Sequence, residues 1–127
     1  MKLLAAAAFL IPVARPAYAA QTFSIVALGD SLTAGYGLPP QDAFTTRLQQ
    51  RLTANGLNVE VVNAGVSGDT SKGGLARIDW SVPDGTGLVI VELGANDALR
   101  GISPAETAKN LDAIIVRLKQ RGIDVLL

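Results

Sequence analysis

The sequence predicts an α/β fold with three layers, in which helices cover both faces of a parallel β-sheet. Short apolar segments rich in β-branched residues alternate with segments whose apolar residues recur at helical spacing. One apolar segment, residues 88–93, is hydrophobic on both faces except at Glu92, as strands buried in parallel sheets usually are. Strand–helix alternation with right-handed connections brings such strands into one parallel sheet.

The first nineteen residues have the layout of a secretory signal peptide. Lys2 gives a positive start, residues 3–14 are mostly apolar, and the small residues Ala17 and Ala19 match the pattern that signal peptidase reads. The apolar run is too short to span a bilayer, so we expect no stable membrane anchor. We predict cleavage after Ala19 and a periplasmic or secreted mature chain, residues 20–127.

The first elements of the mature chain are expected to be a strand, a helix and a second strand. Phe44, Leu48 and Leu52 recur four residues apart, which places one apolar stripe along a helix that Gly56 can end. The two strands are expected over residues 23–28 and 59–62, with a glycine- and proline-rich loop at residues 35–40.

A short helix and a third strand are expected next. The helix follows a loop over residues 65–72 and extends to about Trp80, although two glycines weaken it. Turn residues at 83–85 then lead into the strand over residues 88–93.

The last helix has the clearest start signal in the chain. Ser103, Pro104 and Glu106 predict its N-cap, its first residue and the partner of a capping box. Gly122 can end this helix, and residues 123–127 begin a fourth strand. A domain rarely finishes inside an apolar strand, so we expect a single domain whose sheet is incomplete at the C-terminal side.

Composition excludes several classes of function. Without Lys2 and Arg15, nine basic and eleven acidic side chains remain, a net charge of −2. The sequence contains no cluster of basic residues that would indicate a nucleic-acid partner. The chain has neither cysteine nor histidine, so we expect no disulfide, no metal site and no cofactor.

Polar and small residues follow three of the expected strands. Because ligands of open parallel sheets bind beyond the carboxyl ends of the strands, these residues should share one edge. Ser31 offers a hydroxyl nucleophile, Gly65 an unshielded backbone N–H, and Asn96 a side-chain N–H. The three segments are residues 29–31, 63–65 and 94–97.

Acyl transfer is the chemistry that such an edge can support. Two or three N–H donors that converge on one oxygen form an oxyanion hole, in which one donor contributes about 3 kcal/mol. A serine hydroxyl also needs a general base, usually histidine, and this sequence contains none. Tyr36 and Trp80 can either line a substrate pocket or pack against the core.

Each segment also has a simpler structural interpretation. Asp30 and Ser31 can cap the next helix, and Gly65 and Gly68 can be flexible loop glycines. Residues 94–97 can form an Asx turn before a helix. Their joint position on one sheet edge favours a functional site over these interpretations.

Three sequence blocks resemble those that define the SGNH (GDSL) hydrolases. The blocks are Gly-Asp-Ser-Leu at residues 29–32, Asn-Ala-Gly-Val-Ser-Gly-Asp-Thr at residues 63–70, and Glu-Leu-Gly-Ala-Asn-Asp at residues 92–97. Their order and spacing look most similar to the periplasmic branch that includes bacterial arylesterases, thioesterase I and lysophospholipases. The resemblance extends over residues 23–127.

This resemblance implies a flavodoxin-like SGNH fold and a serine ester hydrolase that needs no cofactor. Ser31 would be the nucleophile and an oxyanion donor, with Gly65 and Asn96 as the second and third donors. Small acyl or aryl esters, thioesters or lysophospholipids would be the substrates. The family's last block, Asp-x-x-His, is not in this sequence, so we expect a C-terminally truncated chain that is inactive alone. The alternatives are a catalytically dead module that binds a small ligand, and a non-functional fragment.

Overall fold

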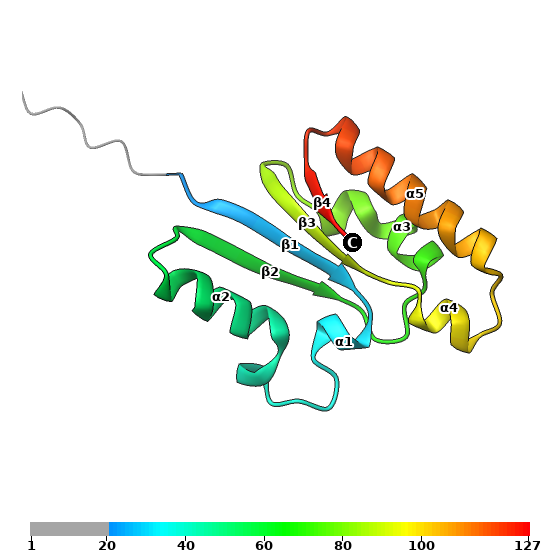
Figure 1. Ribbon diagram of the computed structural model, residues 1–127, viewed down its shortest axis with the longest axis horizontal. Coiled ribbons are helices and arrows are strands. Elements are labelled where there is room, and N and C mark those ends of the chain that lie inside the picture. The colour runs from blue at the N-terminus through cyan, green and yellow to red at the C-terminus, as the bar shows by residue number, and fades with distance from the viewer. Residues whose placement is uncertain (1–20) are drawn as a thin grey trace, which may run out of the picture.

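The structure is a computed structural model that describes residues 21–127, so the expected signal peptide lies outside the described residues. Four parallel strands form one sheet in the order β2-β1-β3-β4, with helices on both faces (Figure 1). The α/β prediction is confirmed. The strands are β1 (Phe23–Gly29), β2 (Val59–Gly65), β3 (Thr86–Glu92) and β4 (Asp124–Leu126). The helices are α1 (Ser31–Ala34), the 3₁₀ helix η1 (Pro40–Asp42), α2 (Phe44–Ala54), α3 (Ser71–Ser81), α4 (Ala95–Leu99) and α5 (Pro104–Gln120).

The main hydrophobic core lies between the sheet and the helices α3 and α5. Alternate residues of β1 and β3 point to this face, and they pack against one apolar stripe of each helix, as period-two strands and amphipathic helices require. Each fully buried side chain of this kind contributes about 1.5–3 kcal/mol. The buried members are Val26, Leu28, Ile78, Val82, Val89, Val91, Ile114, Leu118 and Ile123.

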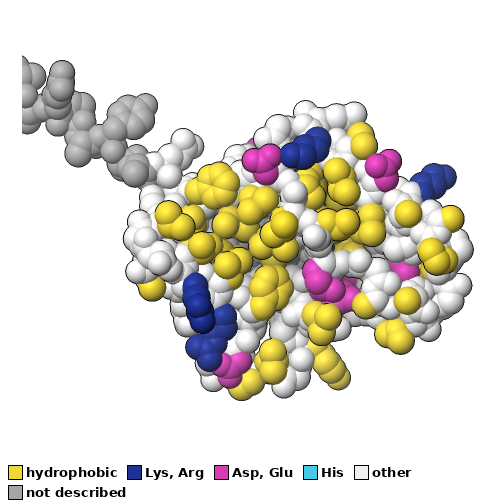
Figure 2. Space-filling view, in the orientation of Figure 1, with side chains coloured by type: hydrophobic (Ala, Val, Ile, Leu, Met, Phe, Trp, Pro, Cys, Tyr) yellow, Lys and Arg dark blue, Asp and Glu magenta, His cyan; other side chains and the backbone are white. Residues whose placement is uncertain are grey.

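The opposite face of the sheet carries α1 and α2 at the β2 side only. Apolar side chains therefore remain visible over the strands in Figure 2. Leu88 and Ile90 of β3 are partly buried there, and Leu126 of β4 is exposed. At the β2 edge, Gln49 of α2 covers the strand, because its amide accepts a hydrogen bond from Val61 N–H at 2.6 Å and donates one to a strand carbonyl.

The start of α5 follows its sequence signal. The Ser103 side chain accepts a hydrogen bond from the Glu106 N–H at 3.2 Å, and Pro104 occupies the first turn. This confirms the predicted N-cap. Within residues 21–127, every helix is too short or too polar to cross a bilayer.

The largest differences from the predicted elements concern β2, α1 and α4. β2 continues three residues beyond Val62, because its register with β1 is kept until Gly29 lies opposite Gly65. Two short helices, α1 and α4, also form where turns were expected. Ser31 and Asn96 are therefore helical residues, and Gly65 is the last residue of a strand.

Candidate active site

Ser31 lies at the carboxyl end of β1, as the first residue of α1. The turn forms because Asp30 acts as the N-cap: its carboxylate oxygen Oδ1 accepts the Leu32 N–H at 3.0 Å. Gly35 ends the helix after one turn with φ of 80°, a left-handed conformation that glycine adopts without steric cost. The Ser31 side chain is thus held, partly buried, at the rim of the sheet.

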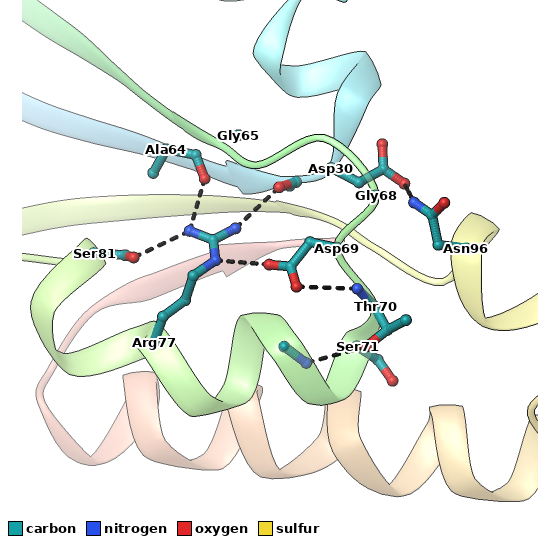
Figure 3. A network of polar contacts seen from close by, with 12 residues as sticks. Asp30, Ala64, Gly65, Gly68, Asp69, Thr70, Ser71, Arg77, Ser81 and Asn96 are labelled. Atoms are coloured by element: carbon teal, nitrogen blue, oxygen red, sulfur yellow. Dashed lines mark hydrogen bonds and ion pairs between the residues drawn. The ribbon is translucent and has the colours of Figure 1, made fainter.

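Asp30 also connects this turn to α4. Its second carboxylate oxygen, Oδ2, accepts a hydrogen bond from the Asn96 side-chain amide at 2.8 Å (Figure 3). Asp30 is 1% exposed, so a charge-assisted bond of this kind fixes the amide orientation strongly. The structure thereby brings Ser31 and Asn96, 65 residues apart in sequence, to one rim.

Several donors at this rim carry no partner. In the described part of the chain, we find no hydrogen bond for the Ser31 N–H, the Ser31 hydroxyl or the second N–H of the Asn96 amide. Because Ser31 and Asn96 are only partly buried, these groups are accessible for hydrogen bonds to an oxygen of a bound molecule.

Gly65 makes a hydrogen bond within the chain through its N–H. Its N–H donates to the side-chain oxygen of Asn63 at 2.9 Å, and Asn63 in turn donates to the Thr33 carbonyl at 2.8 Å. A Cβ at residue 65 would come within 2.2 Å of the Ala34 nitrogen. Glycine at this position therefore allows α1 to pack on β2, and its predicted role as an oxyanion donor stays a prediction.

Gly68 lies in the following loop, beside Asp30 and Asn96 in Figure 3. Hydrogen bonds join the loop to β1 and to the end of α4: Val66 N–H donates to the Gly29 carbonyl at 2.9 Å, and Arg100, the residue after α4, donates to the Gly68 carbonyl at 2.6 Å. Gly68 has φ of 82°, which glycine favours, and among residues 21–127 its N–H has no acceptor. Its sequence signals were its place in the loop after the second strand and its membership of the block at residues 63–70, which it shares with Gly65.

Glu92 ends β3 immediately beneath the Ser31 turn. Its carboxylate accepts hydrogen bonds from the Thr33 hydroxyl at 3.0 Å and from the Asp30 N–H at 3.4 Å. Burial raises the pKa of Glu92; the Thr33 hydrogen bond opposes this effect, and the negative charge of Asp30 adds to it. The rim therefore holds two neighbouring carboxylates, a pairing that the sequence did not indicate.

Asp97 is buried next to Asn96 and joins three helices. It accepts hydrogen bonds from the Ser71 N–H at 2.7 Å, the Ser71 hydroxyl at 2.5 Å and the Thr107 hydroxyl at 3.2 Å. Burial alone would raise the pKa of Asp97, but these bonds outweigh it and lower the pKa. Asp97 therefore holds α4, and with it Asn96, against α3 and α5.

Tyr36 and Trp80 are exposed by 80% and 75%, so the expectation that they pack against the core is wrong. Neither lines a cavity found in the described residues. Across residues 21–127, acidic side chains form no group of three or more that could hold a metal ion. The chemistry available at the rim is therefore that of a hydroxyl and several N–H donors.

The protein family described as GDSL-like Lipase/Acylhydrolase matches residues 27–127 of this chain. The chain belongs to this family. The matched residues of this GDSL-like family member include the Ser31 turn, the Gly68 loop and Asn96.

Curated relatives of this GDSL-like family member carry esterase names. Esterase TesA of Pseudomonas aeruginosa is 44% identical over 110 residues, which cover 86% of this chain and 54% of the relative. Thioesterase 1/protease 1/lysophospholipase L1 of Escherichia coli (strain K12) is 39% identical over 120 residues, which cover 94% and 55%. The chain spans about half the length of the curated relatives it matches.

Solved structures agree with this assignment. The crystal structure of AlinE4, an SGNH-hydrolase family esterase, has a TM-score of 0.80 and 47% sequence identity. The match covers 86% of this chain and 59% of that one. The predicted SGNH fold is thereby confirmed for the described part of the chain.

Proposed function

We propose that this protein contributes the nucleophile and the oxyanion site of a serine ester hydrolase. The observation that carries the proposal is the rim itself, where Ser31 begins a capped turn beside the oriented amide of Asn96. The esterase and thioesterase names of its relatives support small acyl or aryl esters, thioesters or lysophospholipids as substrates.

In this mechanism, the Ser31 hydroxyl attacks the substrate carbonyl, and the carbonyl oxygen becomes an oxyanion. The Ser31 N–H and the free N–H of Asn96 donate to that oxygen. Gly68 supplies the third donor in place of Gly65, because the Gly65 N–H is already bonded to a side chain. Collapse of the tetrahedral intermediate expels the alcohol or thiol and leaves an acyl-serine, which water then hydrolyses.

The general base is the part of the mechanism that these residues do not provide. A histidine oriented by an acid would take the proton from Ser31 and give it to the leaving alcohol or thiol. It would then take a proton from the attacking water and return it to the Ser31 oxygen as the acid product leaves. We propose that both come from a C-terminal segment outside this sequence, in keeping with relatives of which the match covers only 54% and 55%. Without that segment, we expect the 127-residue chain to have no appreciable hydrolytic activity.

A ligand-binding module is the second candidate function. The absence of histidine from the sequence favours it, because the same donors would hold a carboxylate or an ester oxygen without turnover. The two candidates differ in one respect: only the hydrolase needs the Ser31 hydroxyl for covalent chemistry.

A chimera tests the hydrolase directly. Residues 21–127 of this chain replace the matching residues of Pseudomonas aeruginosa TesA, and hydrolysis of a p-nitrophenyl acyl ester is measured. We expect turnover that Ser31→Ala abolishes, whereas Ser24→Ala, at the other end of β1, keeps it. A folded chimera whose hydrolysis does not depend on Ser31 would refute the hydrolase proposal.

Export is a separate proposal that rests on the sequence of residues 1–19. The layout of these residues supports cleavage after Ala19 and delivery to the periplasm or the medium. Mass spectrometry of the protein recovered from each fraction tests it. An exported chain that begins at Ala20 supports the proposal, and an intact Met1 in the cytoplasmic fraction alone contradicts it.

A further inference from the structure

A buried arginine lies beneath the candidate active site. Arg77, in the middle of α3, is 6% exposed and points away from solvent toward the sheet (Figure 3). A guanidinium remains charged at all physiological pH values, so burying it is costly unless its N–H groups all find acceptors. The identity of those acceptors therefore indicates what the side chain is for.

Two of the acceptors are backbone carbonyls at the carboxyl ends of neighbouring strands. Nη2 of Arg77 donates to the Gly29 carbonyl at 3.0 Å, and Nη1 donates to the Ala64 carbonyl at 2.9 Å. Gly29 is two residues before Ser31, and its carbonyl also accepts the Val66 N–H. One guanidinium thus contacts the strand that presents the nucleophile and the strand that leads into the Gly68 loop.

The third acceptor belongs to the loop itself. Nε of Arg77 donates to the Asp69 carboxylate at 2.7 Å, and both side chains are nearly buried, at 8% and 12% exposure. Gly73 makes room for this carboxylate, since a Cβ there would lie 1.7 Å from its Oδ1 atom. Asp69 follows Gly68 directly, so its ion pair fixes the end of the loop.

We propose that Arg77 is a positioning residue for acyl transfer at Ser31. Its planar fork holds the end of β1, the end of β2 and the Gly68–Asp69 loop in one fixed arrangement, and this sets the Ser31 hydroxyl relative to the oxyanion donors. The proposal rests on the proposed hydrolase function. Arg77 touches neither substrate nor Ser31, so its effect passes through Gly29 and the loop.

Lysine cannot replace arginine in this arrangement. Its single ammonium group is a compact charge on a flexible stem, and it lacks the fixed fork that reaches two carbonyls and a carboxylate together. Arg77→Lys therefore keeps the positive charge beside Asp69 and loses the geometry. Arg121 offers a matched control at the amino edge of the sheet, because it too donates to a carbonyl, that of Val82, and to an aspartate.

Amide hydrogen exchange of the 127-residue chain tests the geometry without requiring activity. In Arg77→Lys, we expect the Val66 and Asp69 amides to exchange about tenfold faster or more, because the loop opens locally. The Val82 and Ile123 amides, which report on α3 and the core, should change less than about twofold. Arg121→Lys should leave the Val66 and Asp69 amides unchanged.

Two outcomes would overturn the proposal. Unchanged exchange at Val66 and Asp69 would mean that Arg77 does not hold the loop, and equal acceleration at Val82 and Ile123 would mean that it only stabilises the fold. If Arg77→Lys does not fold, Asp69→Asn replaces it, because this variant removes the charge that anchors the loop and leaves the arginine in place. The same local acceleration is then expected.

Kinetics of the TesA chimera provide the second readout. A misplaced nucleophile lowers turnover, so Arg77→Lys should reduce kcat by about 100-fold and leave KM within about twofold. Arg121→Lys should leave both constants unchanged. A raised KM at unchanged kcat would contradict positioning. A chimera that is inactive with Arg77 intact counts against the proposed hydrolase, whereas the exchange measurement still judges the role of Arg77.

Discussion

A glycine at position 65 could serve either of two purposes: its N–H could bind a substrate oxygen, or its lack of a Cβ could allow close packing. Its N–H was expected to face a substrate oxygen, but the side chain of Asn63 already accepts that hydrogen bond. What the structure requires of residue 65 is the absence of a Cβ, because the backbone of Ala34 lies directly against it. A glycine next to a catalytic motif is therefore ambiguous between binding and packing.

Gly65→Ala should destabilise the fold, because the new methyl group meets backbone atoms of α1 that cannot move separately. We expect a loss of about 1–3 kcal/mol in the free energy of unfolding, measured by urea denaturation. Gly87→Ala in β3 is the control: its Cβ would meet only the ring of Phe23, which is half exposed and can turn away. Equal losses in the two variants would contradict the packing role of Gly65.

Glu92 gives the rim a defined pH dependence. Because burial raises its folded-state pKa above the ordinary 4.5, Glu92 contributes stability that is present below pH 4.5 and is lost as the pH rises through the folded-state pKa. Glu92→Gln keeps an acceptor for the Thr33 hydroxyl and carries no charge. We therefore expect a higher Tm than that of the wild type at pH 7 and a gap that closes near pH 4. A gap of equal size at both pH values would contradict this account.

Single residues were predictable from sequence where the chemistry is local. Ser31 and Asn96 follow strands directly, so the rule for parallel sheets places them at the same edge. The capping role of Asp30 was predictable, but its bond to Asn96 and the contacts of Arg77 were not, since these partners lie 66 and 48 residues away and depend on how the helices pack. Gly68 carried a weak signal that could not separate it from Gly65.

At the scale of elements, one carboxylate determines how the helices around the rim fit together. Asp97 of α4 accepts hydrogen bonds from the start of α3 and from α5, and Asn110 of α5 donates to the hydroxyl of Ser71 at 3.0 Å. A helix of five residues such as α4 is not stable in isolation. These bonds give it a fixed place, and with it Asn96.

Asp97→Asn should loosen this junction, because an amide offers one acceptor oxygen where the carboxylate offers two. We expect a loss of about 2–3 kcal/mol at pH 7, measured by urea denaturation. Since hydrogen bonds lower the folded-state pKa, the stability that Asp97 contributes is present above its ordinary pKa of 3.8 and is lost as the pH falls through the folded-state pKa. The two proteins should therefore approach each other below pH 4, and a constant difference down to pH 3 would be inconsistent with this mechanism.

The long elements were predictable and the short ones were not, for the same physical reason. α2 and α5 have an apolar stripe over several turns, and α5 also has its own cap, so local sequence suffices. α1 and α4 have four and five residues, too few to show a period. α1 is capped locally by Asp30, as the sequence allowed, whereas α4 is held by Asp97 through bonds to residues that are distant in sequence and meet only in the assembled fold.

At the scale of the whole molecule, the two edge strands of the sheet, β2 and β4, differ in whether a side chain covers their outer backbone groups. Gln49 covers the outer edge of β2, whereas β4 pairs with β3 and, within residues 21–127, with no other element. β4 also carries Leu126, which is 57% exposed. In the 127-residue chain by itself, an edge of this kind with an exposed leucine can pair with another strand, either of a second molecule or of a segment that follows residue 127.

Leu126→Lys should therefore reduce self-association, because charge on an edge strand opposes edge-to-edge pairing. Light scattering at increasing protein concentration measures the effect. Leu38→Lys is the matched control, since Leu38 is 54% exposed in a loop away from that edge. If both variants reduce scattering equally, general hydrophobicity is the cause, and the edge of β4 is not.

Because Gln49 of α2 covers the outer edge of β2, a substitution at this residue affects the sheet as well as the helix. The Gln49 amide has the same donor and acceptor as a peptide group, and it uses them on Val61 N–H and the Val59 carbonyl, the two groups that an added strand would pair. The Gln49 side chain thus takes the place of one peptide group of a neighbouring strand. Glutamate is similar in size but would provide only the acceptor. The exchange of Gln for Glu, which is usually regarded as conservative, would therefore leave the Val59 carbonyl without its donor and open to pairing with another strand.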